Sequence, residues 1–326
     1  MKVLLTGGAG YIGSHVNKLL DSKGVETVVL DNLQYGHREA VKWGRLVEVD
    51  LLDYDALNEV FAGSNFDAVL HFAAYIFVGE SVSDPEKYYR NNLMGGLNLL
   101  RAMRANSVDK IIFSSTAAVY GEPHQVPIPE DHPVIPINPY GWSKLILEQM
   151  IADFSRSYDW RSIIFRYFNA AGADPEGEIG ENHNPENHLI PLLLEATLDS
   201  KRSLTVYGTD YETPDGTCIR DYIHVMDLAE AHWLGLMRVT EEESGPSEPF
   251  QIYNIGNGNG FSVREVISSA ARVTGKTPEI IYSSRRPGDA PVLVADSSRL
   301  RNELGWEARH PNLDSIIADA WRWERT

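Results

Sequence analysis

The chain has 326 residues, 43% of them hydrophobic and 23% charged, which is enough for one large α/β unit or two domains with a sizeable core. Its net charge of −17 and its lack of a basic patch argue against a nucleic-acid partner, although a few local arginines can still hold an anionic nucleotide in a cleft. Cys218 is the only cysteine, which excludes an intrachain disulfide, and no apolar stretch approaches the roughly 20 residues that cross a bilayer, so we expect a soluble cytoplasmic protein without a membrane partner.

The first half of the chain alternates short apolar runs with segments of helical periodicity. Runs such as Val28–Leu30 carry few polar positions, as expected for strands that are covered on both faces. Strands that alternate with helices predict an α/β fold built on a doubly wound parallel sheet. The expected strands are Val3–Leu5, Thr27–Leu30, Leu46–Val49, Ala68–Phe72, Lys110–Ser114 and Ser162–Arg166, and the expected helices are Ile12–Ser22, Tyr54–Phe61, Lys87–Arg104 and Tyr140–Tyr158.

The pattern changes after about Asn169. Residues 171–187 are rich in Gly, Pro, Asn and Glu and predict a long loop, which in a compact protein is usually functional. We expect a smaller α/β substrate domain over residues 171–326, with the chain crossing back to the first domain near residues 221–255. Its expected elements are helices Leu189–Leu198, Val225–Arg238 and Val263–Val273, strands Leu204–Tyr207, Gln251–Ile255 and Glu279–Tyr282, and a polar loop Thr209–Thr217.

Three glycines, Gly7, Gly10 and Gly13, lie between the first expected strand and the first helix. Glycine permits a tight turn and a close approach to a pyrophosphate, and the N-terminus of the helix offers it unpaired N–H groups. The second strand ends at Asp31, whose carboxylate suits ribose hydroxyls and repels a 2′-phosphate, so NAD is favoured over NADP. Residues 1–170 are therefore predicted to form a Rossmann-like NAD-binding domain. Asp50-Leu51, after the third strand, either frames the adenine or simply opens a loop.

Tyr140 and Lys144 are four residues apart and share one face of an expected helix. Tyrosine has a pKa near 10 in water, and a neighbouring ammonium is expected to lower that pKa towards the range in which the phenolate acts as a general base. Thr116 follows an apolar strand, at the end where ligands bind in doubly wound sheets, and can hydrogen-bond the reacting oxygen. Together the three residues predict proton transfer beside a dinucleotide.

Several segments resemble the extended short-chain dehydrogenase/reductase family, and most closely its UDP-hexose 4-epimerases. The resemblance runs essentially from end to end, and its combination of motifs is far more specific than the glycine loop. The matching segments are Thr6–His15, His71–Ala74, Val78–Ser81, Tyr140 to Lys144, Arg166–Asn169, Gly208–Tyr211, Asp215–Thr217, Arg220–Val225 and Arg286–Asp289.

The resemblance implies that Tyr140 takes the proton from the sugar's 4-hydroxyl while C4 passes a hydride to NAD. The 4-ketose then rotates and regains the hydride on its other face, which interconverts UDP-galactose and UDP-glucose. Lys144 is expected to hold the nicotinamide ribose, and Thr116 takes the place of the family's Ser or Thr. The family also implies a homodimer packed through two helices of each subunit, near Lys87–Arg104 and Lys144–Tyr158.

The resemblance assigns further residues to the two ligands. In the prediction for NAD they are Gly7, Gly10, Tyr11, Ile12, Gly13, Asp31, Asn32, Asp50, Leu51, Phe72, Ala73, Ala74, Asn91, Ser114, Tyr140, Lys144 and Tyr167. For the UDP-sugar they are Thr116, Tyr140, Asn169, Asn187, Leu189, Tyr207, Arg220, Arg286, Asp289 and Leu293. The neighbouring Asn92 either approaches the cofactor, as in the family, or faces solvent, and Arg220 is expected either at the diphosphate or paired with Asp221.

Leu293 bears on the choice of sugar, because the family has a large residue there in enzymes restricted to glucose and galactose and a small one in those accepting N-acetyl sugars. Leucine is intermediate, so UDP-N-acetylhexosamines, or another UDP-sugar, are the alternative substrates. A 4,6-dehydratase is disfavoured because Ala117-Ala118 stands where such enzymes carry an acid pair. A sensor or scaffold that only retains NAD usually lacks the Tyr or Lys, and this chain has both.

Five histidines, at positions 71, 183, 188, 224 and 232, are expected to be structural or to lie in loops. We see no metal-ligand spacing backed by cysteines or acid clusters, and we predict no metal site. Cys218 is expected to be an ordinary buried thiol.

Overall fold

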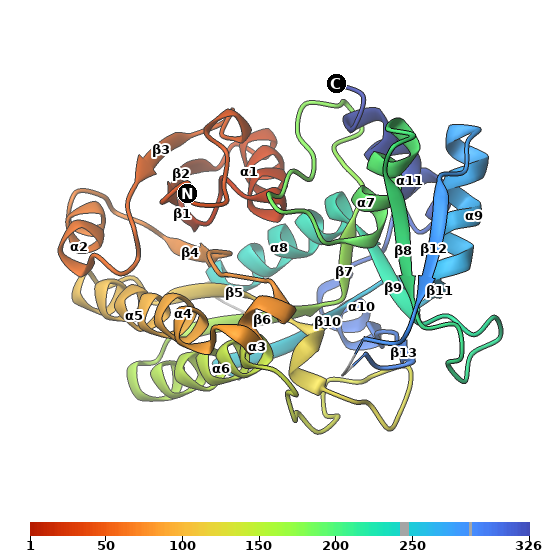
Figure 1. Cartoon of the computed structure of the whole chain (residues 1–326). Helices are drawn as coiled ribbons and strands as arrows, with labels where there is room; N and C mark the ends of the chain where they lie inside the picture. Colours follow the sequence, from red (N-terminus) through yellow and green to blue (C-terminus); the bar gives the residue numbers. More distant parts are fainter. Residues whose placement is uncertain (242–247, 287–288) are drawn as a thin grey trace.

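The computed structural model describes residues 1–241, 248–286 and 289–326 (Figure 1). A seven-stranded sheet runs through the molecule in the order β10-β6-β5-β4-β1-β2-β3, and each neighbouring pair is parallel. The predicted doubly wound parallel sheet is thereby confirmed. Its strands are β1 (Lys2–Thr6), β2 (Glu26–Asp31), β3 (Arg45–Glu48), β4 (Ala68–His71), β5 (Lys110–Thr116), β6 (Arg161–Tyr167) and β10 (Phe250–Ile255).

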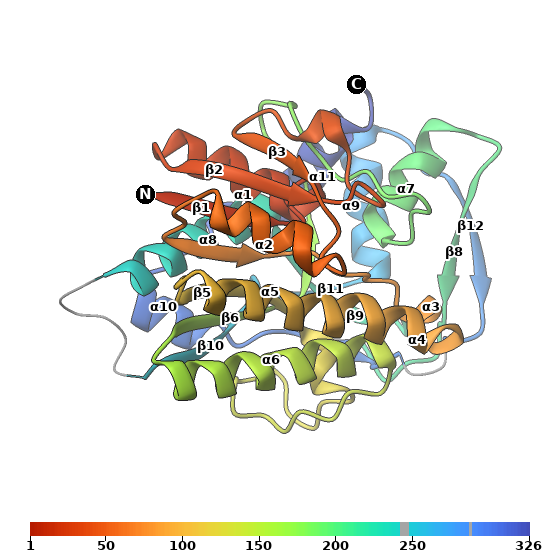
Figure 2. The same cartoon turned by 90° about the vertical axis from the view of Figure 1, so that its left-hand side faces the viewer.

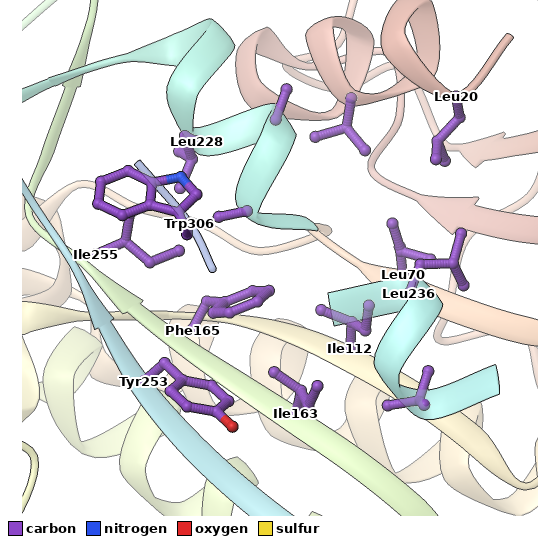
Figure 3. Packing of buried hydrophobic residues seen from close by; sticks show 14 of the residues in the cluster. Leu20, Leu70, Ile112, Ile163, Phe165, Leu228, Leu236, Tyr253, Ile255 and Trp306 are labelled. Carbon is purple, nitrogen blue, oxygen red and sulfur yellow. The ribbon is translucent and has the colours of Figure 1, made fainter. Parts of the chain in front are cut away.

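Alternate residues of these strands enter two separate cores, because successive side chains of a strand point to opposite faces. Leu5 and Leu70 belong to a core that also contains residues of α1 and α8, shown in Figure 3. Leu4 and Val69 belong to a core with residues of α2, α5 and α6, which Figure 2 shows along the other face. No helix in the described ranges combines the length and apolarity of a membrane span. The covering helices are α1 (Tyr11–Ser22), α8 (Val225–Thr240), α2 (Tyr54–Ala62), α5 (Gly95–Ala105) and α6 (Pro139–Tyr158).

The helix predicted over Lys87–Arg104 is present and contains a π-helical turn. The chain forms a short α4 (Pro85–Tyr88), a π-helical turn over Tyr89–Met94, and then α5, and the residues at both junctions keep right-handed helical dihedral angles. The π-helical turn coincides with Asn92, a buried side chain that accepts from the N–H of Tyr75 (2.9 Å) and donates to the hydroxyl of Ser143 (2.9 Å) on α6. A π-helical turn re-aims such a side chain inwards. The expectation that Asn92 faces solvent is therefore wrong.

The second half of the chain forms two smaller sheets. One joins β9 (Ile219–His224) to β7 (Asn169–Ala171), β11 (Gly260–Ser262) and β13 (Val292–Leu293), and the other pairs β8 (Ser203–Tyr207) with β12 (Glu279–Ser283). As predicted, the chain crosses back, since α8 and β10 lie with the large sheet. The division into two domains at residue 170 stays a prediction. The remaining elements are α3 (Val78–Ser83), α7 (Leu189–Leu198), α9 (Val263–Thr274), α10 (Ser298–Leu304), α11 (Leu313–Trp323) and the 3-10 turns Arg38–Ala40 and Ala117–Tyr120.

Asp221, in the middle of β9, ties the smaller sheet to the end of β10. Its carboxylate is fully buried and accepts the N–H groups of Asn257 (2.7 Å), Gly258 (3.0 Å) and Ala295 (3.1 Å). Arg220 points elsewhere and pairs with Asp289 at 3.1 Å. The alternative in which Arg220 and Asp221 pair with each other is therefore wrong, because three backbone donors already occupy the carboxylate.

Candidate active site

The glycine loop between β1 and α1 has a shape that side chains cannot enter. Gly7 has φ +74°, and a Cβ there would lie 2.4 Å from the backbone nitrogen of Ala73. A Cβ on Gly13 would lie 2.4 Å from the carbonyl oxygen of Gly7. Gly10 caps α1 without a side-chain hydrogen bond, and the first turn, which starts at Tyr11 and Ile12, contains no acid. A pyrophosphate therefore fits the polypeptide here, since the backbone is bare and the helix dipole is uncompensated.

Polar groups for a ribose lie at the end of β2. The carboxylate of Asp31 is buried and accepts the N–H groups of Ala9 (3.0 Å) and Leu33 (2.9 Å). Burial raises the pKa of Asp31, and these two N–H groups oppose the rise. Asn32 donates to Asp50 at 2.9 Å, which joins the ends of β2 and β3. The predicted adenosine residues thus gather at one end of the loop.

Neighbouring strand ends bring the remaining cofactor residues level with one another. In the register, Thr6 faces His71, and Phe72 and Ala73 both donate their N–H groups to the carbonyl of Thr6, at 2.8 and 3.0 Å. Ala74 continues this segment. The carboxyl ends of β1, β4, β5 and β6 therefore form one edge, where ligands bind in sheets of this kind.

Tyr140 and Lys144 lie on the first turns of α6, which starts after Asn138, whose side chain accepts the N–H of Gly141 at 2.8 Å. The Thr116 side chain lies close enough to the Tyr140 hydroxyl to lower its pKa. Lys144 donates to the carbonyl of Ser114 at 2.8 Å. The structure therefore brings together the three predicted catalytic side chains, Tyr140 and Lys144 from α6 and Thr116 from the end of β5.

Burial dominates the electrostatics of this group. Burial raises the pKa of Tyr140 to about 12, and the Thr116 hydroxyl opposes the rise. Burial also lowers the pKa of Lys144 to about 7, against the pull of Glu148. In the polypeptide by itself desolvation therefore dominates the pKa of both groups, and the lowering of the Tyr140 pKa by Lys144 stays a prediction for the complete site.

A buried ion pair behind Lys144 escaped the sequence analysis. Arg166 on β6 contacts Glu148 on α6 at 2.6 Å, and the two side chains are 4% and 3% exposed. Ser115 donates to the same carboxylate, and Arg166 also donates to the hydroxyl of Tyr120 at 3.2 Å. The available signal was an acid four residues after Lys144 on the buried face of the helix. The pair fixes α6 against β6, and Ser115 ties the same carboxylate to β5, the strand that carries Thr116.

Two other cofactor candidates flank this group. Tyr167 lies at the end of β6, and the pKa of its hydroxyl is raised by burial and by the nearby Tyr140 and lowered by Ser114. Asn91 donates to the side chain of Asn92 at 3.0 Å and lines a cavity of about 380 Å³ with Tyr75. Tyr167 therefore lies at the reacting group, whereas Asn91 lies beside the cavity.

The predicted UDP residues come from separate segments that the smaller sheets assemble. Leu293 lies opposite Arg220 in the pairing of β13 with β9. Arg220 also donates to the carbonyl of Ala290 at 2.9 Å, and Arg286 stacks on Tyr207 at 4.1 Å. Two cations, stacked and anchored in this way, suit a diphosphate beside a flat ring. Of the other candidates, Asn169 lies on β7 and donates to the carbonyl of Asp221, Leu189 opens α7, and Asn187 lies in the loop before it.

Two histidines have structural partners, as predicted. His71 is held to Thr6 at 2.6 Å and His232 to Ser114 at 3.0 Å, and burial lowers their pKa values to about 3 and about 4. His224 is buried beside Asp319 and lies in one group with His310 whose side-chain types could ligate a metal. Cys218 is buried, and burial raises the pKa of its thiol.

The prediction that no acid cluster backs the histidines was wrong for two of them. The loop before α7 folds back so that His183 and His188 lie against Glu181 and Glu186. The interleaved acids were visible in the sequence, but the way the loop doubles back was not.

Known proteins resemble this chain over nearly its whole length. The family described as "NAD dependent epimerase/dehydratase family" matches residues 3–256. A UDP-glucose 4-epimerase of Azospirillum brasilense is 49% identical over 326 residues, covering 100% of this chain and 92% of that protein. The solved UDP-glucose 4-epimerase of Brucella ovis in complex with NAD has a TM-score of 0.93 at 48% identity and covers 98% of both chains. That of Bifidobacterium longum in complex with NAD+ and UDP has a TM-score of 0.93 at 38% identity, covering 100% of this chain and 98% of that one. The chain belongs to the NAD dependent epimerase/dehydratase family.

Proposed function

We propose that this protein is an NAD-dependent epimerase that interconverts UDP-galactose and UDP-glucose at C4. The observation that carries the proposal is the joint placement of Tyr140, Thr116 and Lys144 at the strand edge that also bears the glycine loop. Such a placement puts a proton-transfer group beside a hydride acceptor, and the likeness to UDP-glucose 4-epimerases supports the same reaction.

Residues of the large sheet would hold NAD. The bare backbone at Gly7, Gly10 and Gly13 would receive the pyrophosphate, and Asp31 the adenosine ribose. Lys144 has an ammonium with two further donors after its bond to Ser114, which suits the nicotinamide ribose. When bound, NAD supplies the hydride acceptor and a positive ring that favours a phenolate nearby.

The chain's own residues then account for the proton. The oxygen of Tyr140 takes the proton of the sugar's 4-hydroxyl as the C4–H bond breaks and its electron pair leaves as hydride. The products are a 4-ketose and a protonated Tyr140. Thr116 hydrogen-bonds the reacting oxygens and stabilises the phenolate, as it does in lowering the pKa of Tyr140. After the ketose rotates, hydride returns to the opposite face of C4 and Tyr140 gives its proton back, so atoms and charge balance over one turnover.

In this proposal, residues of the smaller sheets bind the UDP half of the substrate. Arg220 and Arg286 would bind the diphosphate, and Asp289, now paired with Arg220, would accept a uridine ribose hydroxyl. Asn169, Asn187, Leu189 and Tyr207 would complete the pocket. Leu293 is half-buried beside Arg220 and would set how much bulk is tolerated at C2, so UDP-N-acetylhexosamines remain the alternative substrates.

A homodimer is part of the proposal. The exposed side of the helical layer carries large apolar residues: Met94 (57% exposed), Leu97 (38%), Trp142 (40%) and Ile146 (38%). They belong to α5, α6 and the turn preceding α5, which pack side by side in Figure 2. A contiguous apolar face of this kind marks an interaction surface, and a second copy would bury it through two helices from each subunit.

The first test is to incubate the purified protein with UDP-galactose, without added NAD, and to measure UDP-glucose. Formation of product would support both the reaction and retained NAD. In the variant Tyr140→Phe, which keeps the ring and loses only the hydroxyl, we expect turnover to fall by at least about a hundredfold while NAD stays bound. Turnover at the wild-type rate in this variant contradicts the mechanism. If no product forms even with added NAD, UDP-N-acetylgalactosamine is the next substrate to test.

A further inference from the structure

Four side chains of the types that ligate metals converge in the loop before α7: Glu181, His183, Glu186 and His188, here called the Glu/His cluster. One nitrogen or oxygen atom of each lies within 4.8 Å of those of the other three. None of the four takes part in the proposed reaction. Figure 1 shows this loop at the same end of the molecule as α11 and the C-terminus.

The spacing within the cluster is close to that of a tetrahedral metal site. His188 Nδ1 lies 2.8 Å from an oxygen of Glu181 and 3.0 Å from one of Glu186. His183 Nδ1 lies 3.2 Å from an oxygen of Glu181 and 3.5 Å from the other oxygen of Glu186. Zinc bonds to nitrogen and oxygen of roughly 2.0–2.2 Å place tetrahedral ligand atoms about 3.3–3.6 Å apart. One observed separation lies in that range and three are shorter, so the side chains would move apart by a few tenths of an ångström to receive an ion.

Three of the four side chains are largely buried, His188 is 41% exposed, and the cluster contains a nitrogen without a hydrogen bond. The side chains of Glu181 and Glu186 are both 7% exposed, and that of His183 is 12% exposed. Although two carboxylates lie close to it, His183 Nδ1 makes no hydrogen bond within the described structure. A buried nitrogen in this state calls for a partner. A cation at the centre of the cluster would be that partner, and two carboxylates would balance a divalent charge.

The surrounding structure holds the cluster in place. One oxygen of Glu186 accepts the N–H groups of Asn187 (2.7 Å) and His188 (2.8 Å), which orients its other oxygen towards His183. The indole N–H of Trp323 in α11 donates to the carbonyl of Glu181 at 2.8 Å. Partners of this kind, which fix the ligands rather than touch the ion, are a regular part of protein metal sites.

We propose that the Glu/His cluster binds one divalent transition-metal ion of the zinc class, with all four positions supplied by this chain. A site without an open position is structural rather than catalytic. Two imidazoles favour zinc over magnesium or calcium, which prefer oxygen ligands. The ion would hold the loop against α11, next to Asn187 and Leu189, which are candidates for binding the UDP-sugar.

The test measures the metal and does not depend on activity. Untagged protein is dialysed against Zn²⁺, passed through a desalting column, and its zinc content is determined by mass spectrometry. We expect one zinc per chain in the wild type and a loss of at least about tenfold in zinc affinity in His183→Gln and in Glu186→Gln. The matched control is Glu195→Gln, which lines the same cavity of about 200 Å³ without belonging to the cluster and should bind zinc as the wild type does.

Two results would overturn the proposal. One is a wild-type protein that retains no zinc above that of Glu186→Gln. The other is a Co²⁺ titration of the wild type that lacks the intense visible absorption of a tetrahedral ion. Because the cobalt spectrum uses only the wild-type chain, it decides the question even if a variant fails to fold.

Discussion

Replacing Glu148 with glutamine tests the buried ion pair behind the reacting group. The glutamine keeps the shape of the side chain but removes the charge that faces Arg166 at 2.6 Å. An arginine left without its carboxylate at 4% exposure keeps its desolvation penalty, and breaking such a pair costs about 3–5 kcal/mol. The amide oxygen still accepts one hydrogen bond, so we expect a loss near about 3 kcal/mol.

This loss of folding free energy corresponds to a decrease in the melting temperature. With an unfolding entropy of about 2.1 cal/mol/K per residue, a chain of 326 residues loses about 4 °C for 3 kcal/mol. The control is Asp153→Asn on the same helix, which removes a carboxylate from an exposed pair with Arg156 and should shift the melting temperature by less than about 1 °C. Circular dichroism follows both variants. Equal melting temperatures for Glu148→Gln and Asp153→Asn would refute the reasoning.

The same substitution acts on Lys144. The charge of Glu148 raises the pKa of Lys144, which burial has lowered to about 7. Without that charge the pKa falls further, so the lysine loses its proton at a lower pH. If the ammonium is needed for turnover, the pH above which kcat declines should move to lower values in Glu148→Gln and stay unchanged in Asp153→Asn. A pH–rate profile measures the shift. An alkaline limb at the same pH in both variants would show that the protonation of Lys144 does not control turnover.

Three further substitutions test other parts of the structure. Gly13→Ala places a Cβ 2.4 Å from the carbonyl oxygen of Gly7 and should lower both the melting temperature and the amount of bound NAD. Gly10→Ala meets no protein atom closer than 3.4 Å, so its melting temperature should equal that of the wild type while it binds less NAD. Release of the nucleotide measures the bound NAD in both variants. Ile146→Glu should convert a dimer into monomers in light scattering, with Gln149→Glu as the control on the same helix. Asp221→Asn turns an amide N–H₂ towards backbone donors, which should cost ~2 kcal/mol and lower the melting temperature by about 3 °C. It should also raise the KM for the UDP-sugar, because Arg220 is the neighbouring residue. An unchanged KM would show that Asp221 does not act on substrate binding through Arg220.

The large sheet was predictable because its signals are local. Val28–Leu30 and Ile111–Phe113 are apolar without interruption, as buried parallel strands require, and the strands alternate along the chain with segments of helical periodicity. The glycine loop and the Tyr140–Lys144 spacing are local as well, so the proton-transfer group could be proposed from the sequence. The helix over Lys87–Arg104 was also predicted, but its π-helical turn was not, because the partners of the buried Asn92, Tyr75 and Ser143, are not revealed by periodicity.

Both strands of the β8–β12 sheet were predicted, whereas the four-stranded sheet was missed for the opposite reason. Strands β7, β11 and β13 have two or three residues each, too few for any alternation to be visible. β9 carries a buried Asp221, which makes the segment read as polar although three backbone donors satisfy it. Short strands of this kind are set by their partners rather than by propensity.

The same contrast divides the site itself. The half expected to hold NAD is built from backbone turns and strand ends, whose geometry nearby residues dictate, and one segment suffices to recognise it. The half expected to hold the sugar depends on pairs made across the fold, such as Arg220 with Asp289 and Arg286 on Tyr207. Replacing Leu293 between such pairs changes the space for the sugar without altering the glycine loop or Tyr140. Substrate preference can therefore change, without a change of reaction, at the segments that sequence patterns describe least well. A Leu293 variant should change the choice between hexose and N-acetylhexosamine and leave NAD retention unchanged.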